Sequence, residues 1–307
     1  MSAERSTILI TGGSGLIGSA LTRSLLSEGH EVRHLGRSKG STSKVQTFLW
    51  DPDRGRIDEL AVIGADHIVH LAGAPIAAKR WTDPRVNELI ASRAGTADLL
   101  RNTVEKLGLR PKSFISAAGI GYYGAITTDR TLSEEDPPGG DTIARISVEW
   151  EHAADRWKEI CRVVKLRTPV VLSAKGGALS KLMTPVKLGV GSALGAGDQW
   201  MPWVHLRDLV RIYQFAIGNE AMEGVYNAGP TTDTTNDVMM RTLAKVLHKP
   251  YFMPNFPAFV LRLLLGEMAA ILLEGSRADD ARLKAAGFKF EFEDLEMALT
   301  DLLRRDQ

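Results

Sequence analysis

Glycines in residues 11–18 have the spacing that lets a backbone wrap around a phosphate group. The segment reads Thr-Gly-Gly-Ser-Gly-Leu-Ile-Gly and follows a short apolar run at residues 8–10. Gly12 permits a tight turn, Gly15 lets backbone N–H groups approach a pyrophosphate, and Gly18 lets a following helix pack on the preceding strand. The alternative is a glycine-rich turn without a ligand. The predicted contacts span the whole segment: Thr11, Gly12, Gly13, Ser14, Gly15, Leu16, Ile17 and Gly18.

The residue after the second predicted strand indicates which dinucleotide would bind. An NAD site carries a carboxylate about 20 positions beyond the glycines, whereas an Arg there accepts the 2′-phosphate of NADP. Residues 35–39 read Leu-Gly-Arg-Ser-Lys, with no carboxylate. A guanidinium presents several planar donors to a phosphate. Arg37 and Ser38 therefore predict NADP(H) as the preferred cofactor and NAD(H) as the alternative, unless Arg37 is an ordinary solvated side chain.

Residue types that bind metals or form disulfides are sparse in this chain. His67 and His70 are three residues apart in a predicted strand, so they point to opposite faces and cannot share an ion. His205 is expected to make a structural hydrogen bond. Cys161 is the only cysteine, which excludes an internal disulfide and fits a reducing compartment. The sequence therefore predicts no metal centre.

The charges and hydropathy of the chain limit its partners. The 38 basic and 37 acidic residues leave no overall field that would favour nucleic acid or an anionic membrane. Residues 259–273 are very apolar, but Arg262 and Glu267 interrupt them, which favours a buried helix over a membrane span of about 18–20 apolar residues. No signal peptide is recognisable. We expect a cytoplasmic protein with a small-molecule substrate and no nucleic-acid or membrane partner, of an oligomeric state that the composition leaves open.

The candidate cofactor and catalytic residues can form one site only if the fold brings their loops together at one edge of a sheet. Short apolar runs predict strands, and apolar residues at helical spacing predict the helices between them. The predicted strands are residues 8–11, 31–35, 48–50, 67–72, 113–118, 163–167 and 224–227. The predicted helices are residues 16–28, 83–107, 150–160, 236–247, 257–274 and 294–304. This alternation implies right-handed crossovers and a parallel sheet with helices on both faces.

The predicted fold class is α/β, a Rossmann-type doubly wound parallel sheet with a small, mainly helical C-terminal subdomain. We expect residues 1–230 to form the NAD(P)-binding domain and residues 231–307 to form a substrate-side cap. Two segments are predicted as loops. Residues 36–43 are polar, and residues 176–197 are glycine-rich and would leave the sheet as an excursion near 176–200.

Several short motifs resemble the extended short-chain dehydrogenase/reductase superfamily. They are the glycine turn at residues 11–18, Leu71-Ala-Gly73 after the fourth strand, and Tyr123-Gly124 after the fifth. Finer motifs resemble its atypical, epimerase-like branch, the NAD-dependent epimerase or nucleoside-diphosphate-sugar epimerase type, which has its own C-terminal domain. These are His70-Leu-Ala-Gly-Ala, Arg80-Trp81, Ser92-Arg93, Gly121-Tyr-Tyr-Gly124, Arg167-Thr168, Gln199-Trp-Met-x-Trp-x-His205, Leu263-Leu-Leu-Gly-Glu-Met268 and Gly287-Phe288. The resemblance covers nearly the whole chain.

The resemblance implies further cofactor contacts beyond the glycine turn. Leu71, Ala72 and Gly73 would line the adenosine side with backbone and small side chains, a role that ordinary packing at a strand end would also explain. Glu88 matches a cofactor-contacting position of the family, although by itself it reads as a solvated helix residue. Ile115, on the fifth strand, completes the predicted set.

The catalytic residues that the superfamily uses are incomplete here. Its standard mechanism needs a Tyr with a Lys four residues later, and none of the five tyrosines has one. The family's fifth strand usually reads Ser-Ala-Ser-Ala, whereas residues 116–119 read Ser-Ala-Ala-Gly. An unassisted phenol, with a pKa of about 10, is a poor base at neutral pH but a usable acid. We predict Tyr123 as the proton donor, helped by Tyr122 and Ser116, unless the tyrosines only pack the loop.

A second cluster, at residues 200–208, could wall a substrate pocket. It includes Trp200, Trp203, His205 and Arg207, and Asp208 is expected to cap the helix that follows. Tryptophans at such spacing are more often core residues, so one or two of them at most would touch substrate.

Two functions fit these observations. The first is an NADP(H)-binding oxidoreductase or epimerase that acts on a small carbonyl, alcohol or sugar-nucleotide substrate without the Tyr-x-x-x-Lys dyad. The second is a non-catalytic NADP(H)-sensing or scaffold protein. The missing dyad favours the second function, and the aromatic residues of the predicted pocket favour the first.

Overall fold

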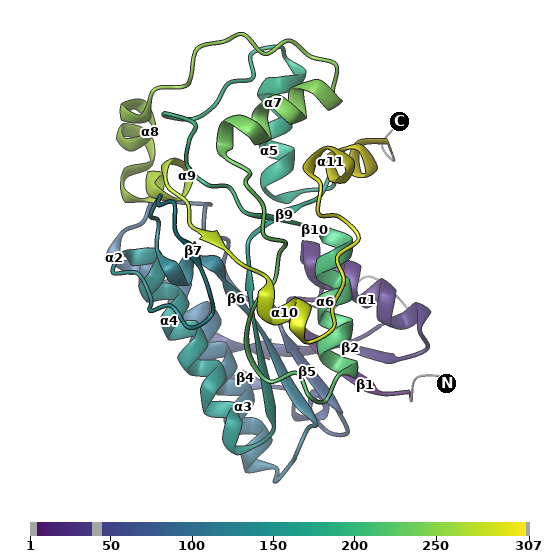
Figure 1. Cartoon of the computed structure of the whole chain (residues 1–307). Coiled ribbons are helices and arrows are strands. Elements are labelled where there is room, and N and C mark those ends of the chain that lie inside the picture. The colour runs from purple at the N-terminus through teal and green to yellow at the C-terminus, as the bar shows by residue number, and fades with distance from the viewer. Residues whose placement is uncertain (1–4, 39–44, 305–307) are drawn as a thin grey trace.

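A large, mainly parallel sheet forms the centre of the protein, as Figure 1 shows for the computed structural model. The structure describes residues 5–38 and 45–304, so residues 39–43 of the predicted polar loop lie outside it. The strand order is β11-β8-β6-β5-β1-β2-β3-β4, and only β4 runs antiparallel to its neighbour. The strands are β1 (Thr7–Thr11), β2 (Glu31–Gly36), β3 (Gln46–Asp51), β4 (Arg56–Ile57), β5 (His67–His70), β6 (Ser113–Gly119), β8 (Arg162–Thr168) and β11 (Gly224–Asn227). This arrangement confirms the predicted doubly wound α/β class.

Helices cover both faces of the sheet because residues along each strand alternate in direction. Ile8 and Ile10 of β1 pack in the hydrophobic cluster beneath α1 (Leu16–Ser27) and α6 (Leu206–Gly218). Leu9, between them, packs in the opposite cluster beneath α3 (Thr96–Lys106) and α4 (Thr142–Asp155). The two faces are visible in Figure 1 on opposite sides of the strands. The chain reverses its direction of winding between β1 and β5, where ligands of such sheets bind.

Three predicted helices differ from the structure in their extent. The helix expected over residues 150–160 is α4, which begins eight residues earlier, and a 3₁₀ turn (Arg156–Glu159). The helix expected over residues 83–107 is α2 (Asp83–Ile90), one π-helical turn (Ala91–Gly95) and α3. The helix expected over residues 257–274 is α8 (Ala258–Leu265), a 3₁₀ turn and α9 (Ala270–Leu273). The break falls at Gly266, whose φ of +61° ends α8.

The remaining C-terminal elements pack against earlier parts of the chain. They are α7 (Asn236–Val246), β12 (Arg277–Ala278), α10 (Ala281–Ala285) and α11 (Leu295–Arg304). β12 pairs with β7 (Thr131–Leu132), and β9 (Val170–Leu172) pairs with β10 (Trp203–His205), in two small parallel sheets. Over residues 5–38 and 45–304, no helix has the length and apolar character needed to cross a membrane.

The prediction of a loop over residues 176–197 is wrong, because α5 (Gly177–Lys187) occupies its first half. Two glycines at its start and Pro185 inside it conceal the helical pattern. Leu179, Met183 and Val186 are buried at helical spacing and share a hydrophobic cluster with α7 and α11. The boundary predicted at residue 230 therefore separates segments that pack together, and it stays a prediction.

Candidate functional site

The glycine turn presents the unpaired start of a helix at the carboxyl edge of the sheet. Gly12 has a φ of +68°, and its carbonyl accepts a hydrogen bond of 3.0 Å from the Gly15 N–H. Gly15 precedes α1 without any side-chain cap, and the first turn of α1 has no acidic residue. Ser14 and Gly15 are exposed. The helix start therefore offers free N–H groups and the positive end of its dipole to an anion.

The glycines of this turn meet different steric limits. A Cβ on Gly18 would lie 2.4 Å from the Gly12 carbonyl oxygen, and a Cβ on Gly13 would lie 2.5 Å from the ring of His34. At Gly15 the nearest atom is the Gly12 oxygen, 3.2 Å away, and no other atom lies within 4 Å. Gly18 is thus required by packing against the backbone, whereas a side chain at Gly13 would displace the His34 ring. A Cβ at Gly15 would make one tight contact, with the Gly12 carbonyl oxygen.

Thr11 links β1 to β5, the two strands between which the chain reverses its direction of winding. Its side chain is fully buried, and its hydroxyl lies 2.9 Å from Nδ1 of His70. The N–H groups of Leu71 and Ala72 each donate to the same oxygen at 3.1 Å. The Thr11 side chain therefore fixes the loop after β5, and the backbone of that loop is left to face a ligand.

Arg37 and Ser38 are exposed at the carboxyl end of β2, next to the glycine turn in the sheet. Thr11, the last residue of β1, is paired with Leu35, two residues before Arg37. Within the described part of the chain, Arg37 forms no ion pair. An unpaired guanidinium beside a helix start is suited to a phosphate dianion.

Two predicted cofactor residues are placed apart from the glycine turn. Glu88 is exposed on α2, where its carboxylate lies 2.7 Å from Nη1 of Arg85, and this hydrogen bond lowers the pKa of Glu88. Ile115 is fully buried in β6 between Val69 and Val164. Among the described residues, no recorded contact joins either one to the turn, so their cofactor roles stay predictions.

The Tyr123 hydroxyl is enclosed by the protein. Its oxygen lies 2.8 Å from the Ser133 carbonyl and 2.8 Å from Oδ1 of Asn227, and it accepts a hydrogen bond of 3.0 Å from Nη1 of Arg167. Only 3% of the residue is exposed, and burial raises the pKa of Tyr123 to about 12. Ser116 is also buried, with its hydroxyl donating to the Ala117 carbonyl. Both hydroxyls are therefore engaged within the protein.

Tyr122 is placed differently. Its side chain is half-buried, and its ring lies against the Arg167 guanidinium, with 3.4 Å from Cζ to the ring centroid. The ring is perpendicular to that of Tyr123. No hydrogen bond of the Tyr122 hydroxyl is recorded among the described residues. The stack with Arg167 fixes the orientation of the Tyr122 ring.

Sequence reasoning missed the buried charges behind these tyrosines. Arg167 is 2% exposed and makes two hydrogen bonds to Glu151 of α4, of 2.6 and 3.2 Å. Nζ of Lys165 lies 3.1 Å from the same carboxylate. Lys165 and Arg167 are separated by one apolar residue in β8, and two basic residues on one face of a buried strand were the available signal. Asn227 has no such signal, because it lies 104 residues beyond Tyr123.

The cluster at residues 200–208 joins the C-terminal segment to α6. Trp203 is fully buried and donates to the Thr234 hydroxyl. His205, and not Asp208, caps α6 by accepting from the Arg207 N–H at 3.0 Å. Asp208 instead accepts backbone N–H groups of the C-terminal segment. The prediction that Asp208 caps α6 is wrong. The helix begins at Leu206, so His205 is the residue before it, and a ring nitrogen of His205 accepts the hydrogen bond that a cap makes.

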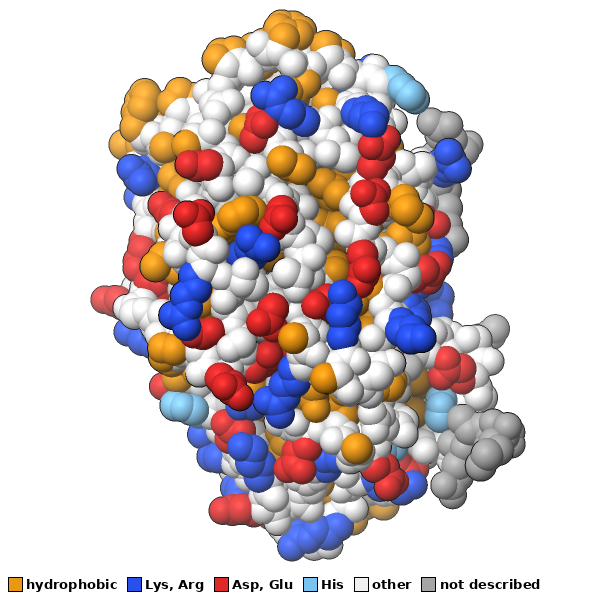
Figure 2. All heavy atoms as spheres, viewed as in Figure 1, with side chains coloured by type: hydrophobic (Ala, Val, Ile, Leu, Met, Phe, Trp, Pro, Cys, Tyr) orange, Lys and Arg blue, Asp and Glu red, His pale blue; other side chains and the backbone are white. Residues whose placement is uncertain are grey.

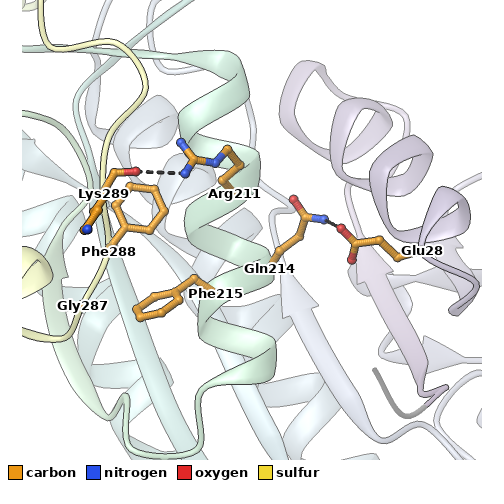
Figure 3. A pocket seen from close by; sticks show the side chains of 7 residues that line it. All are labelled: Glu28, Arg211, Gln214, Phe215, Gly287, Phe288 and Lys289. Atoms are coloured by element: carbon orange, nitrogen blue, oxygen red, sulfur yellow. Dashed lines mark hydrogen bonds between the residues drawn. The ribbon is translucent and has the colours of Figure 1, made fainter. Parts of the chain in front are cut away.

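One hollow of the described surface lies away from these residues, with a volume of about 450 Å³ (Figure 3). It lies between α6, the end of α1 and the segment after α10, and no predicted site residue lines it. Its polar groups are bonded to one another: Gln214 to Glu28, and Arg211 to the Lys289 carbonyl. The glycine turn therefore remains the better candidate for a ligand site. No group of His, Cys, Asp or Glu side chains in the described ranges is arranged to hold a metal ion.

Comparisons with known proteins agree with this geometry. The model of the NAD dependent epimerase/dehydratase family matches residues 8–229, and a domain of unknown function matches residues 256–302. Epimerase family protein SDR39U1 of Mus musculus is 34% identical over 304 residues, which is 96% of this chain and 99% of that protein.

Two solved structures are similar over nearly the whole chain. The crystal structure of human epimerase family protein SDR39U1 with NADPH has a TM-score of 0.87 and 31% identity, covering 97% of this chain and 99% of that one. A nucleoside-diphosphate sugar epimerase from Corynebacterium glutamicum has a TM-score of 0.79 and 30% identity, covering 98% of this chain and 58% of that one. The chain therefore belongs to the NAD dependent epimerase/dehydratase family.

Proposed function

We propose that the protein binds NADP(H) at the glycine turn and uses it as an oxidoreductase or epimerase on a small carbonyl, alcohol or sugar-nucleotide substrate. One observation carries the cofactor assignment: the uncapped start of α1 lies beside Arg37, which is exposed and forms no recorded ion pair with the described residues. The human relative crystallised with NADPH supports the same choice.

Removal of the Arg37 guanidinium tests this assignment. A charge-assisted hydrogen bond contributes about 1.5–3 kcal/mol, so Arg37→Ala should weaken NADPH binding by roughly 10- to 150-fold. NADH lacks the 2′-phosphate, so its affinity should change little. Calorimetric titration of both cofactors measures the difference.

The matched control is Arg23→Ala, because Arg23 is also an exposed arginine and lies on α1 beyond its first turn. It should leave the affinities for both cofactors unchanged. Equal affinities of the unmodified protein for NADPH and NADH would contradict the assignment.

For the chemical step, we assign proton donation to Tyr122 and positioning to Tyr123 and Arg167. When bound, the nicotinamide supplies or accepts a hydride. Tyr122 is the more exposed of the two tyrosines, whereas Tyr123 and Ser116 are buried and their hydroxyls are already bonded. Arg167 supports the Tyr122 ring and donates to Tyr123, and Glu151 holds Arg167 in place.

Single phenylalanine substitutions separate these roles. Tyr122→Phe should lower turnover by about 100-fold or more without changing cofactor affinity, because a positioned proton donor contributes about 10²–10⁴-fold. Tyr123→Phe should retain the proton donor but destabilise the fold by about 1–3 kcal/mol, because buried polar groups lose their partner. Tyr226→Phe, another buried tyrosine, is the control. Cofactor oxidation with a panel of carbonyls and sugar nucleotides gives the turnover.

A non-catalytic NADP(H) sensor or scaffold is the second candidate. The observation in its favour is that the hydroxyls of Tyr123 and Ser116 are both occupied by hydrogen bonds inside the protein. Full activity in Tyr122→Phe, Tyr123→Phe and the double variant would remove the proton-donor assignment. NADPH binding without turnover on any substrate of the panel would favour the sensor.

A further inference from the structure

A patch of exposed apolar side chains covers the end of the molecule that is formed by α8 and the segment joining α7 to α8. Phe252 and Leu263 are each 74% exposed and Phe259 is 71% exposed. Figure 2 shows apolar side chains gathered at the top, over the segment joining α7 and α8, and at the upper left, over α8. We call this set the cap patch: Leu188, Val190, Phe252, Met253, Phe256, Phe259, Leu263 and Leu264.

The cap patch is continuous although its residues come from two segments. A Cβ on Gly189 would lie 3.8 Å from Cγ of Pro250, which places the end of α5 beside the start of the second segment. Phe256 forms a bridge with Leu194, and its carbonyl accepts from the Gly195 N–H at 2.9 Å. α8 follows at once, and none of its eight residues is buried. One face of α8, with Phe259, Leu263 and Leu264, is thus exposed, whereas Leu265 packs against a hydrophobic cluster.

Basic residues outnumber acidic ones in the two segments that carry the cap patch. Residues 176–197 and 247–266 contain no Asp or Glu. They carry Lys181, Lys187, Lys249 and Arg262, all of them exposed. Three acidic residues adjoin these segments: Asp198 and Glu267 follow them directly, and Asp237 contacts the first segment. Glu267 accepts a hydrogen bond from Thr142, and Asp237 is paired with Arg241. The near balance of the whole chain, from which the sequence predicts no membrane partner, hides this local excess of positive charge.

We propose that the cap patch docks the protein onto the surface of an anionic phospholipid bilayer. Exposed Phe and Leu side chains rimmed by basic residues are the composition that inserts at the boundary between headgroups and acyl chains. The positive rim is complementary to an anionic headgroup layer. Docking is peripheral and needs no helix that spans the membrane.

The same charges disfavour the other occupants of such a patch. In a symmetric pair of copies, the lysines of one rim would face those of the other, and like charges at an interface repel. Three of the four rim cations are lysines, a residue type that is depleted at protein–protein interfaces. The composition therefore favours a lipid surface over a protein partner.

Sedimentation of the full chain with vesicles tests the proposal. One set of vesicles contains phosphatidylcholine with phosphatidylserine, and the other contains phosphatidylcholine alone. The protein should partition onto the first set at least about 10-fold more strongly, and added salt should weaken the binding. The triple variant Phe252→Ser, Phe259→Ser, Leu263→Ser should lose about 10-fold or more of this partitioning.

Two controls separate docking from general stickiness or misfolding. Leu60→Ser with Met297→Ser removes apolar side chains that are 62% and 61% exposed elsewhere, and this variant should bind vesicles as the parent does. Retained NADPH binding by the triple variant would show that its fold is intact. Equal partitioning onto both sets of vesicles, or an unchanged triple variant, would overturn the proposal. So would a dimer in sedimentation velocity that the triple variant abolishes, because the patch would then join two copies.

Discussion

At the scale of single residues, the glycine turn shows what spacing can and cannot predict. The tight turn at Gly12 and the close packing at Gly18 are confirmed by the φ of +68° and by the Gly12 oxygen 2.4 Å from a Cβ on Gly18. Gly13 has a constraint that no spacing shows, because His34 reaches it from a neighbouring strand. The backbone geometry of a turn can be predicted from the residues of that turn, whereas contacts between strands depend on the register of the sheet.

Gly15 and Gly18 should respond to alanine in opposite ways. Gly15 has a φ of −73°, which alanine adopts, and its Cβ would meet only the Gly12 carbonyl oxygen, at 3.2 Å, so Gly15→Ala should cost little stability and lose nucleotide affinity. Gly18→Ala would force its Cβ into the Gly12 carbonyl, which should destabilise the fold by about 1–3 kcal/mol. Urea unfolding gives the stability of each variant, and calorimetry gives its NADPH affinity. Unchanged affinity in a folded Gly15→Ala variant would contradict the phosphate site.

The tyrosine pair illustrates the same limit. The sequence identifies Tyr122 and Tyr123 as a pair, but it does not show which hydroxyl is engaged. The partners of Tyr123 include Ser133, ten residues away, and Asn227, 104 residues away. Only the assembled sheet brings β11 beside β8 and so places Asn227 against this ring.

At the scale of elements, α4 is joined to the sheet by buried charge as well as by apolar packing. Glu151 is 4% exposed and is shared by Lys165 and Arg167 of β8. A buried ion pair gains little over an apolar pair, but removal of one partner leaves an uncompensated charge. The position of Arg167, and with it the support beneath Tyr122, therefore depends on this carboxylate.

Glu151→Gln should destabilise the protein far more than a surface equivalent. We expect a loss of about 3–5 kcal/mol in the free energy of unfolding, because the buried Arg167 loses its counter-charge and Lys165 keeps only Asp155. Glu105→Gln is the control: its carboxylate pairs with Arg101 on the surface of α3, where such a pair contributes about 0–1 kcal/mol. Urea midpoints of both variants measure the difference. Equal losses in the free energy of unfolding would show that the buried ion pair contributes no more to stability than the surface pair.

Elements differed in how well the sequence predicts them. The central strands β1, β5, β6 and β8 lie close to their predicted bounds, because they are buried on both faces. The two-residue β4 has no such run. α5 was missed because Pro185 and its leading glycines oppose helix formation locally, and packing on α7 and α11 stabilises the helix all the same.

At the scale of the whole molecule, the first and last parts of the chain share their hydrophobic clusters. Leu283 and Phe288 belong to the cluster that contains Ile8, Ile10 and Tyr213. The ring of Phe288 lies 5.7 Å from that of Phe215 on α6. The C-terminal segment is therefore part of the core of the nucleotide-binding sheet as well as of the cap.

Phe288→Ala should test this shared core. Phe288 is 5% exposed, so its truncation should lower the free energy of unfolding by about 3–5 kcal/mol. Phe252→Ala, at a residue that is 74% exposed, should change it by no more than about 0.5 kcal/mol. A single cooperative transition, lowered as a whole in Phe288→Ala, would show that the two parts unfold together. A separate early transition of the C-terminal part would contradict it.

The shared core has a consequence for synthesis on the ribosome. The last strand of the sheet ends at Asn227, but the cluster on its α6 face is completed only by Phe288, roughly 60 residues later. At about 5–20 residues per second, translation leaves that apolar face incomplete for roughly 3–12 s. The nascent chain then exposes surface that the finished protein buries, which is the form that chaperones recognise. Final folding of this protein is thus expected to follow, and not to accompany, its translation.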